Sequence, residues 1–220
     1  MSLGLRFIRW GLANALLAGI SCLCAGGVKL PSVTLYLVAF ALTDLVSTLL
    51  ISPDLAKERS RPVSQGIDPV IRPIASLLFV ATVALGALDV GRLHWTLPLP
   101  EGVQVAALVA FGAGNALQIW AMAVNAFFST ELRIQEECGH RLITNGPYRW
   151  IRHPGYLAMM IIVPSTAFAL GSMLALLPAA MYVALILFRV EREDRFLLRN
   201  LPGYTDYIQG APERLIPGVW

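Results

Sequence analysis

The chain has 220 residues, of which 56% are hydrophobic and only 14% are charged, and its mean hydropathy is +0.65. A soluble globular domain is about a quarter charged, so this composition excludes an ordinary soluble domain and indicates a polytopic helical membrane protein. The net charge is only +3, and the three cysteines offer neither an even disulfide framework nor a zinc-ligand spacing, so we expect no nucleic-acid partner and no metal.

Apolar segments close to the roughly 20 residues that cross a bilayer recur along the chain. We expect membrane-spanning helices over 10–25, 33–51, 70–88, 103–128, 156–170 and 173–188, the last two forming a tight hairpin through Gly171 and Ser172. The first segment is too long for a signal peptide and is read as a retained span. The predicted fold is an all-α membrane bundle of about six transmembrane helices, with residues 1–220 forming a single integral membrane domain.

The basic residues are distributed unevenly among the segments that join these spans. With six spans, 15 of the 17 Lys and Arg residues lie on one side of the membrane, and only Lys29 and Arg92 lie on the other. The positive-inside rule predicts that the basic side, which holds both termini, is cytoplasmic. The polar segments that follow the fourth and sixth spans then face the compartment where nucleotide-derived cofactors are found.

The stretch over 140–156 reads HRLITNGPYRWIRHPGY, and it is polar, basic and rich in turns between two apolar blocks. Pro147 and Pro154 restrict the backbone there, and N–H groups at the start of the helix after His153 favour an anion. The pattern predicts a site for an anionic or nucleotide-like ligand. The alternative is an interfacial belt in which aromatic residues settle at headgroup level and Arg contacts lipid phosphate, which explains Trp150 and Arg149 well.

The tail that begins at Arg189 predicts a second wall for this site. On a helix Arg189 and Glu193 share a face, and Arg189 lies at the junction with an apolar span, where an ionisable residue is a functional candidate. The neighbouring charges fit an ordinary solvated helical face: Glu191, Arg192, Asp194 and Arg195. Polar residues inside the spans are expected to join helices rather than bind a ligand; they are Asp44, Asn115, Gln118 and Asn125.

Three runs of sequence, GHRLITNGPYRWIRHPGY, EDRFLLRNLPGYTDY and RLIPGVW, together resemble the isoprenylcysteine carboxyl methyltransferases, and more closely their small bacterial relatives. The resemblance is strongest over 125–220 and weaker at the ERS motif at 58–60 and the LDVGR motif at 88–92. It implies an integral membrane enzyme that uses S-adenosyl-L-methionine. Residues 1–124 then supply N-terminal spans, and residues 125–220 form the cofactor-binding methyltransferase core at the cytoplasmic surface.

The resemblance also implies the residues of the site, by matching positions. The implied cofactor-binding residues are Gln135, His140, Leu142, Ile143, Tyr148, His153, Pro154, Tyr156 and Glu193. Gln135 matches only if a short gap is allowed before His140. Arg189 matches the arginine that handles the substrate carboxylate and is the implied catalytic residue. The family usually has two glutamates where this chain has Glu193 and Asp194.

The leading functional prediction is methyl transfer to a lipophilic acceptor delivered from the bilayer, either the carboxylate of an isoprenylcysteine-like substrate or that of another amphiphile. The resemblance implies a bacterial inner-membrane location, with both termini and the active site cytoplasmic and with membrane lipids as neighbours. An amine acceptor, as in phospholipid N-methylation, is an alternative for which Arg189 would be less useful. Two further alternatives are an NADPH-dependent membrane reductase of the sterol reductase type and a non-enzymatic lipid-binding membrane protein.

Overall fold

The structure is a computed structural model, and it describes residues 1–27, 30–60, 69–211 and 213–220. Lys29, Arg61 and the remainder of the polar segment 61–68, which enter the charge pattern above, lie outside the described residues. The all-helical prediction is confirmed for the described part. The α-helices are α1 (Leu3–Ala25), α2 (Pro31–Leu50), α3 (Pro53–Glu58), α4 (Ile71–Leu88), α5 (Glu101–Val124), α6 (Pro154–Leu170), α7 (Leu176–Asn200) and α8 (Tyr204–Gly210).

Four helices in the described ranges are long and apolar enough to cross a membrane: α1, α2, α4 with the turn that continues it, and α5. Large apolar side chains on them face outward, such as Leu12 at 67% and Leu23 at 76% exposure on α1. A water-facing helix would not carry such a surface, whereas lipid accepts it. This is an integral membrane protein. The two remaining predicted spans correspond to α6, which has 17 residues, and to the apolar first half of α7.

Three predicted boundaries differ from the helix ends by several residues, and the first is the start of the span 10–25, because α1 begins at Leu3. The predicted span 103–128 ends as a helix at Val124, because Asn125 adopts an extended conformation and its side-chain oxygen accepts a hydrogen bond of 2.9 Å from the Phe127 N–H. Such a side-chain turn competes with the helix for the backbone. The helix of the last predicted span does not end at residue 188, since α7 continues through its charged half to Asn200.

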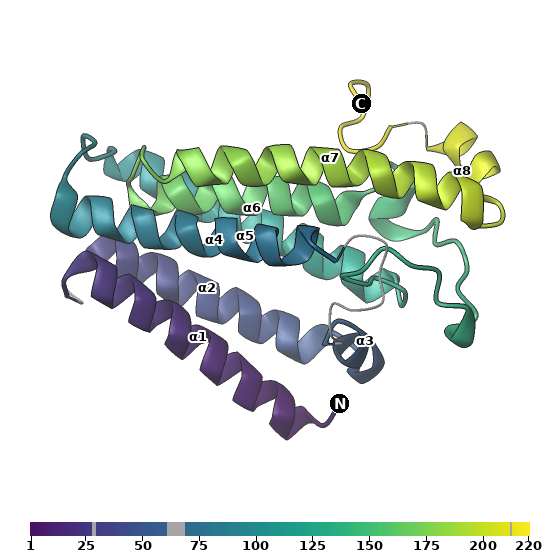
Figure 1. Cartoon of the computed structure of the whole chain (residues 1–220), viewed down its shortest axis with the longest axis horizontal. Coiled ribbons are helices and arrows are strands. Elements are labelled where there is room, and N and C mark those ends of the chain that lie inside the picture. The colour runs from purple at the N-terminus through teal and green to yellow at the C-terminus, as the bar shows by residue number, and fades with distance from the viewer. Residues whose placement is uncertain (28–29, 61–68, 212) are drawn as a thin grey trace.

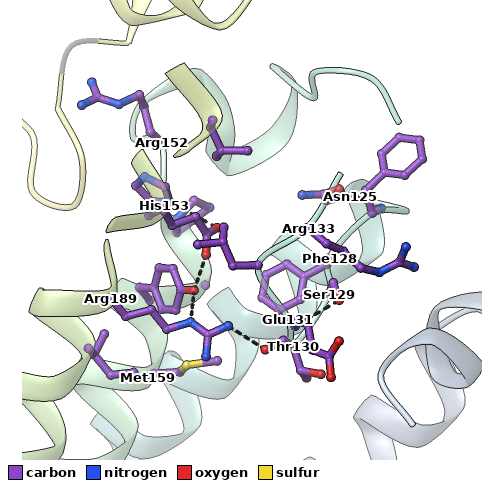
Figure 2. Close-up of a pocket in the computed structure, with 18 of the residues that line it drawn as sticks. Asn125, Phe128, Ser129, Thr130, Glu131, Arg133, Arg152, His153, Met159 and Arg189 are labelled. Carbon is purple, nitrogen blue, oxygen red and sulfur yellow. Dashed lines mark hydrogen bonds and ion pairs between the residues drawn. The ribbon is translucent and has the colours of Figure 1, made fainter. Parts of the chain in front are cut away.

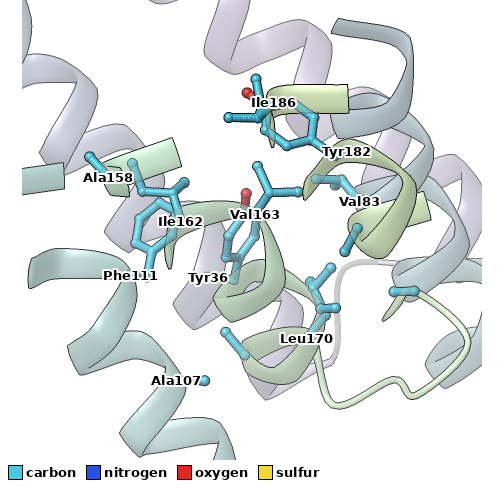
Figure 3. Packing of buried hydrophobic residues seen from close by; sticks show 14 of the residues in the cluster. Tyr36, Val83, Ala107, Phe111, Ala158, Ile162, Val163, Leu170, Tyr182 and Ile186 are labelled. Atoms are coloured by element: carbon cyan, nitrogen blue, oxygen red, sulfur yellow. The ribbon is translucent and has the colours of Figure 1, made fainter. Parts of the chain in front are cut away.

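The core of the bundle forms around α6, which packs against α2, α4, α5 and α7. Figure 3 shows Tyr36 of α2 and Phe111 of α5 meeting Ile162 and Val163 of α6. The rings of Tyr36 and Phe111 are edge-to-face, with their centroids 5.4 Å apart. Gly114 lets α5 approach closely, because a Cβ atom there would lie only 2.9 Å from Ile162 Cγ1. Small residues at helix contacts are typical of packing between membrane helices.

The two ends of the bundle differ in character. In Figure 1 the N-terminus, α3, the segment 125–153, α8 and the C-terminus gather at one end, and the turn between α6 and α7 lies at the other. The first of these ends is tied together by Arg6, whose guanidinium donates to the carbonyls of Thr48 and Ile51, the latter at 2.7 Å. The last carbonyls of α2 thereby gain a cationic partner.

The opposite end is closed by Asp89, which opens a π-helical turn, Asp89–Leu93, and is 1% exposed. Its carboxylate accepts from the backbone N–H of Trp95 at 2.9 Å, the N–H of Thr96 at 3.1 Å and the hydroxyl of Ser172 at 2.6 Å, and also from the Thr96 hydroxyl. Asp89 therefore joins the end of α4 to the turn between α6 and α7.

We expect Asp89→Asn to lower the free energy of unfolding by about 2–3 kcal/mol, because the amide nitrogen would face donors in place of an oxygen. Unfolding of the detergent-solubilised protein by heat or denaturant measures the change. Asp54→Asn makes the same chemical change at an exposed position in the first turn of α3, and should stay within about 0.5 kcal/mol of the parent. Equal effects of the two substitutions would show that the Asp89 contacts do not stabilise the fold.

Candidate active site

A cavity of about 510 Å³ opens among the segment 125–143, α6, α7 and α8. This volume is in the range of small-molecule binding sites. Nine of the ten residues predicted for the site line it: His140, Leu142, Ile143, Tyr148, His153, Pro154, Tyr156, Arg189 and Glu193. The structure thus brings together side chains from segments that are far apart in the sequence, and Figure 2 shows His153 and Arg189 among other residues that line the cavity.

The position of the RHP motif is fixed by the C-terminal tail. Pro154 takes the first position of α6, where its missing N–H and fixed φ are tolerated. The backbone N–H groups of Arg152 and His153 donate to the carbonyls of Glu213 at 3.1 Å and Arg214 at 2.9 Å. The described residues 213–220 therefore fold back beside the motif and hold His153 at the cavity wall.

Arg189 and Glu193 are joined through the Tyr156 hydroxyl. The Arg189 Nε–H donates to the Tyr156 hydroxyl at 2.8 Å, and that hydroxyl donates to Glu193 Oε2 at 2.5 Å. Arg189 also donates to the carbonyl of Thr130 at 2.6 Å, a contact that Figure 2 shows. On the other side of Glu193, its Oε1 lies 3.9 Å from His153 Nδ1. A cation and an anion are thus held at fixed positions on one wall.

Asp194, predicted to lie on a solvated helical face, is buried, and that prediction is wrong. It is 5% exposed and accepts hydrogen bonds from Arg152 (Nε, 2.9 Å), His153 (Nε2, 3.1 Å), Tyr204 (hydroxyl, 2.6 Å) and Arg214 (Nε, 2.9 Å). Burial alone would raise the pKa of Asp194, but these donors lower the pKa well below its ordinary value. The ionised carboxylate links the RHP motif to α8 and to the tail.

His140 is held in one orientation by its neighbours. Its ring stacks on Phe127 with centroids 4.6 Å apart, and its Nδ1 accepts from the Gln135 backbone N–H at 3.2 Å. Burial, together with the nearby Arg133 guanidinium, lowers the pKa of His140 below its ordinary value. The neutral ring therefore carries its proton on Nε2, which makes that nitrogen the donor available to a ligand.

Gln135 is the one predicted residue that does not line the cavity. It is 3% exposed, and its side-chain amide donates to the Phe127 carbonyl at 2.9 Å. Through this contact and its backbone bond to His140, Gln135 supports the residues that reach the cavity. Its assignment to the cofactor site stays a prediction.

Sequence reasoning missed several residues of the cavity. Asn125 lines it and donates to the Tyr148 hydroxyl at 3.1 Å, although it had been assigned to helix contacts. Its position directly after the last apolar turn of α5 was the signal that could have found it. Arg59 and Arg72 also line the cavity. The sequence marked Arg59 only through the weaker resemblance at the ERS motif and Arg72 only as a member of a basic segment.

The fold and the site define a class: an integral membrane protein of α-helices with a ligand-sized cavity, lined by both charged and apolar side chains, at one end of the bundle. The family model of the isoprenylcysteine carboxyl methyltransferases matches residues 105–199, which include most of α5, all of α6 and nearly all of α7. This match confirms the resemblance found in the sequence, and it indicates a membrane methyltransferase.

One curated relative carries a name that refers to metal resistance and not to methyl transfer. The chain is 28% identical over 140 residues to the nickel-cobalt-cadmium resistance protein NccN of Alcaligenes xylosoxydans xylosoxydans. The similarity covers 60% of this chain and 59% of that protein. The chain therefore spans less than two thirds of the length of this relative.

Proposed function

We propose that this protein transfers a methyl group from S-adenosyl-L-methionine to the carboxylate of a lipophilic acceptor at the cytoplasmic surface of the membrane. The observation that carries the proposal is the shared cavity wall on which Arg189, Tyr156 and Glu193 are linked by hydrogen bonds of 2.8 and 2.5 Å. An arginine suited to a carboxylate thus lies next to a glutamate suited to a cofactor's hydroxyl or ammonium groups.

The charge of the cavity favours an anionic acceptor over an amine. Its described lining contains six arginines and two glutamates: Arg59, Arg72, Arg133, Arg141, Arg152, Arg189, Glu131 and Glu193. A protonated amine would enter an excess of like charge, whereas a carboxylate would be attracted. This argument supports O-methylation of a carboxylate and weighs against phospholipid N-methylation.

The residues present fit the cofactor. Leu142 and Ile143 lie in a segment that is neither helix nor strand, and within the described chain their N–H and C=O groups take part in no backbone hydrogen bond, so they can pair with the edge of an adenine. Glu193 can accept from ribose hydroxyls or the α-amino group, and His153 and nearby N–H groups can hold the methionine carboxylate. The Tyr148 and Tyr156 rings offer faces to a sulfonium cation.

Bound S-adenosyl-L-methionine would supply an electrophilic methyl group on a positively charged sulfur. A carboxylate acceptor is ionised at neutral pH, so the chain need not provide a general base. Its task is to align the reactants, which proximity and orientation accomplish. Arg189 holds the acceptor carboxylate through paired N–H···O bonds, and Tyr156 with Thr130 fixes the direction of the guanidinium.

The proposal includes six membrane crossings in the bacterial inner membrane, with α6 and the apolar half of α7 as the last two. Both chain termini lie at the end of the bundle that carries the cavity, as an even number of crossings requires (Figure 1). The distribution of Lys and Arg supports a cytoplasmic location for this end.

Calorimetric titration of the detergent-purified protein with S-adenosyl-L-methionine, S-adenosylhomocysteine and NADPH tests the proposal. We expect both sulfur compounds to bind saturably, and Glu193→Gln to weaken them by about 10- to 100-fold, because a hydrogen bond to a charged group is lost. Glu191→Gln is the matched control, since Glu191 belongs to the same helix but pairs with the exposed Arg195.

Each other outcome points to another function. Binding of NADPH alone would favour the membrane reductase. A folded protein that binds none of the three would favour the lipid-binding membrane protein, and the proposed enzyme would be rejected. Equal weakening by the two substitutions would remove Glu193 from the cofactor site.

A further inference from the structure

The N-terminal half of the chain supplies one wall of the cavity. Arg59, Arg72, Ala75, Ser76, Phe79 and Val80 line it. All six precede residue 105, where the match to the family model begins. This wall combines a cationic end with the apolar surface of α4, so its chemistry differs from that of the wall formed by α7.

Arg59 is held at the cavity by specific contacts. The preceding residue, Glu58, accepts from Arg133 at 2.7 Å and from the Ser129 hydroxyl at 3.2 Å, which ties the end of α3 to the segment that follows α5. The Arg59 guanidinium lies 5.3 Å from the centre of the Phe128 ring. That ring in turn packs on Gly155, where a Cβ atom would lie 2.4 Å from it.

One nitrogen of this guanidinium has no hydrogen-bond partner. Within the described part of the chain, the buried side-chain atoms without a partner are Arg59 Nη1 and Glu131 Oε1, and both residues line this cavity. Burial, and secondarily the charge of Arg72, lowers the pKa of Arg59 to about 10, so the group is still cationic at neutral pH. Buried polar groups in proteins are nearly always satisfied, which indicates that a ligand supplies the partner.

We propose that Arg59, with Arg72 beside it, binds an anionic group of the methyl acceptor, a carboxylate or a phosphate on an apolar chain. The Arg72 guanidinium donates to the Arg59 carbonyl at 3.4 Å, so two cationic side chains meet at this point. Ala75, Phe79 and Val80 continue the wall as an apolar surface. The assignment rests on the proposed function and adds to it a second cationic contact, besides Arg189, for an anionic group of the acceptor.

The test uses three probes that share a ten-carbon skeleton: decanoate, decyl phosphate and decanol. Each is titrated calorimetrically, in one nonionic detergent, into protein saturated with S-adenosylhomocysteine. We expect the two anions to bind at least about tenfold more tightly than decanol. Arg59→Gln should reduce this advantage at least about threefold, the remainder coming from Arg189, while the affinity for S-adenosylhomocysteine stays within about threefold of the parent.

Arg195→Gln is the matched control, because it removes the same charge from an exposed side chain on α7. It should leave the preference for anions unchanged. If Arg59→Gln also lost S-adenosylhomocysteine binding, Arg59→Met, which preserves contact with Phe128, would replace it in the same comparison. Inorganic phosphate added at the probe concentration should not displace decyl phosphate.

Several results would overturn the assignment. If the parent protein binds decanol as tightly as decanoate, the cavity has no anion subsite for the acceptor. If the Arg59 variants keep the preference for anions unchanged, Arg59 does not form that subsite. Displacement by inorganic phosphate would show that the arginines serve a soluble anion instead. Failure of the parent to bind S-adenosylhomocysteine would reject the proposed function itself, whereas normal binding without a preference for anions would reject this assignment alone.

Discussion

Replacing Asp194 with asparagine is expected to lower the free energy of unfolding by about 3–5 kcal/mol. The buried carboxylate accepts from two arginines, a histidine and a tyrosine. An asparagine amide has an NH₂ group in place of one carboxylate oxygen, so some of the N–H and O–H groups that donate to Asp194 would point at another donor. The guanidinium groups of Arg152 and Arg214 would also lose their counter-charge. Denaturant unfolding in detergent measures the change, and the tail should become more susceptible to proteolysis.

The same carboxylate makes stability depend on pH. Because the donors lower the pKa of Asp194 in the folded state, its contribution is complete above the ordinary carboxyl pKa of about 4. The contribution declines as the pH falls below that value and disappears once the folded-state pKa is passed. Asp194→Asn should lack this part of the acid sensitivity. Asp206→Asn, an exposed change on α8, should behave as the parent, and a similar loss in both variants would contradict the prediction.

Replacing Arg189 with glutamine is expected to slow methyl transfer by about 10²–10³-fold, because the acceptor carboxylate would lose a charged, paired donor. Transfer of a labelled methyl group from S-adenosyl-L-methionine to an S-farnesylcysteine with a free carboxylate measures this rate. Arg189→Lys should restore little, since an ammonium group cannot reproduce the planar fork of a guanidinium.

The affinity for S-adenosylhomocysteine separates this role from a structural one. Arg189 also holds the Thr130 carbonyl and the Tyr156 hydroxyl, so its loss could disturb the fold. We expect cofactor affinity to stay within about threefold of the parent, with Arg195→Gln as the control for removing a positive charge. Unchanged transfer in Arg189→Gln would limit Arg189 to bracing the segment after α5.

The positions of the helices followed from composition, but their ends did not. Runs of apolar residues predict helices because a bilayer demands internal hydrogen bonding. The end of α5 depends on one side chain, Asn125, which turns the backbone through its own hydrogen bond. The length of α7 depends on tertiary contacts of its charged half, and hydropathy does not record them.

The sequence predicted those residues of the candidate site that lie within compact local motifs. His153, Tyr156 and Glu193 were found because their motifs are compact and resemble a family. The burial of Asp194 was missed because Tyr204 and Arg214 approach it only after the chain turns at α8. Arg59 was missed for a similar reason, since its place depends on Phe128 packing against Gly155.

The continuity of α7 determines how far apart the parts of an acceptor can be bound. Tyr182, Arg189 and Glu193 line the cavity from one unbroken helix, and the helical rise sets them about 10 Å and about 6 Å apart along its axis. In the proposed function, an acceptor would therefore be bound along this fixed spacing, from its apolar body to its reacting oxygen. Inserting one residue between Tyr182 and Arg189 would rotate the polar pair by about 100° away from the apolar part. Discrimination between acceptors then depends on the length of the group that joins headgroup to tail.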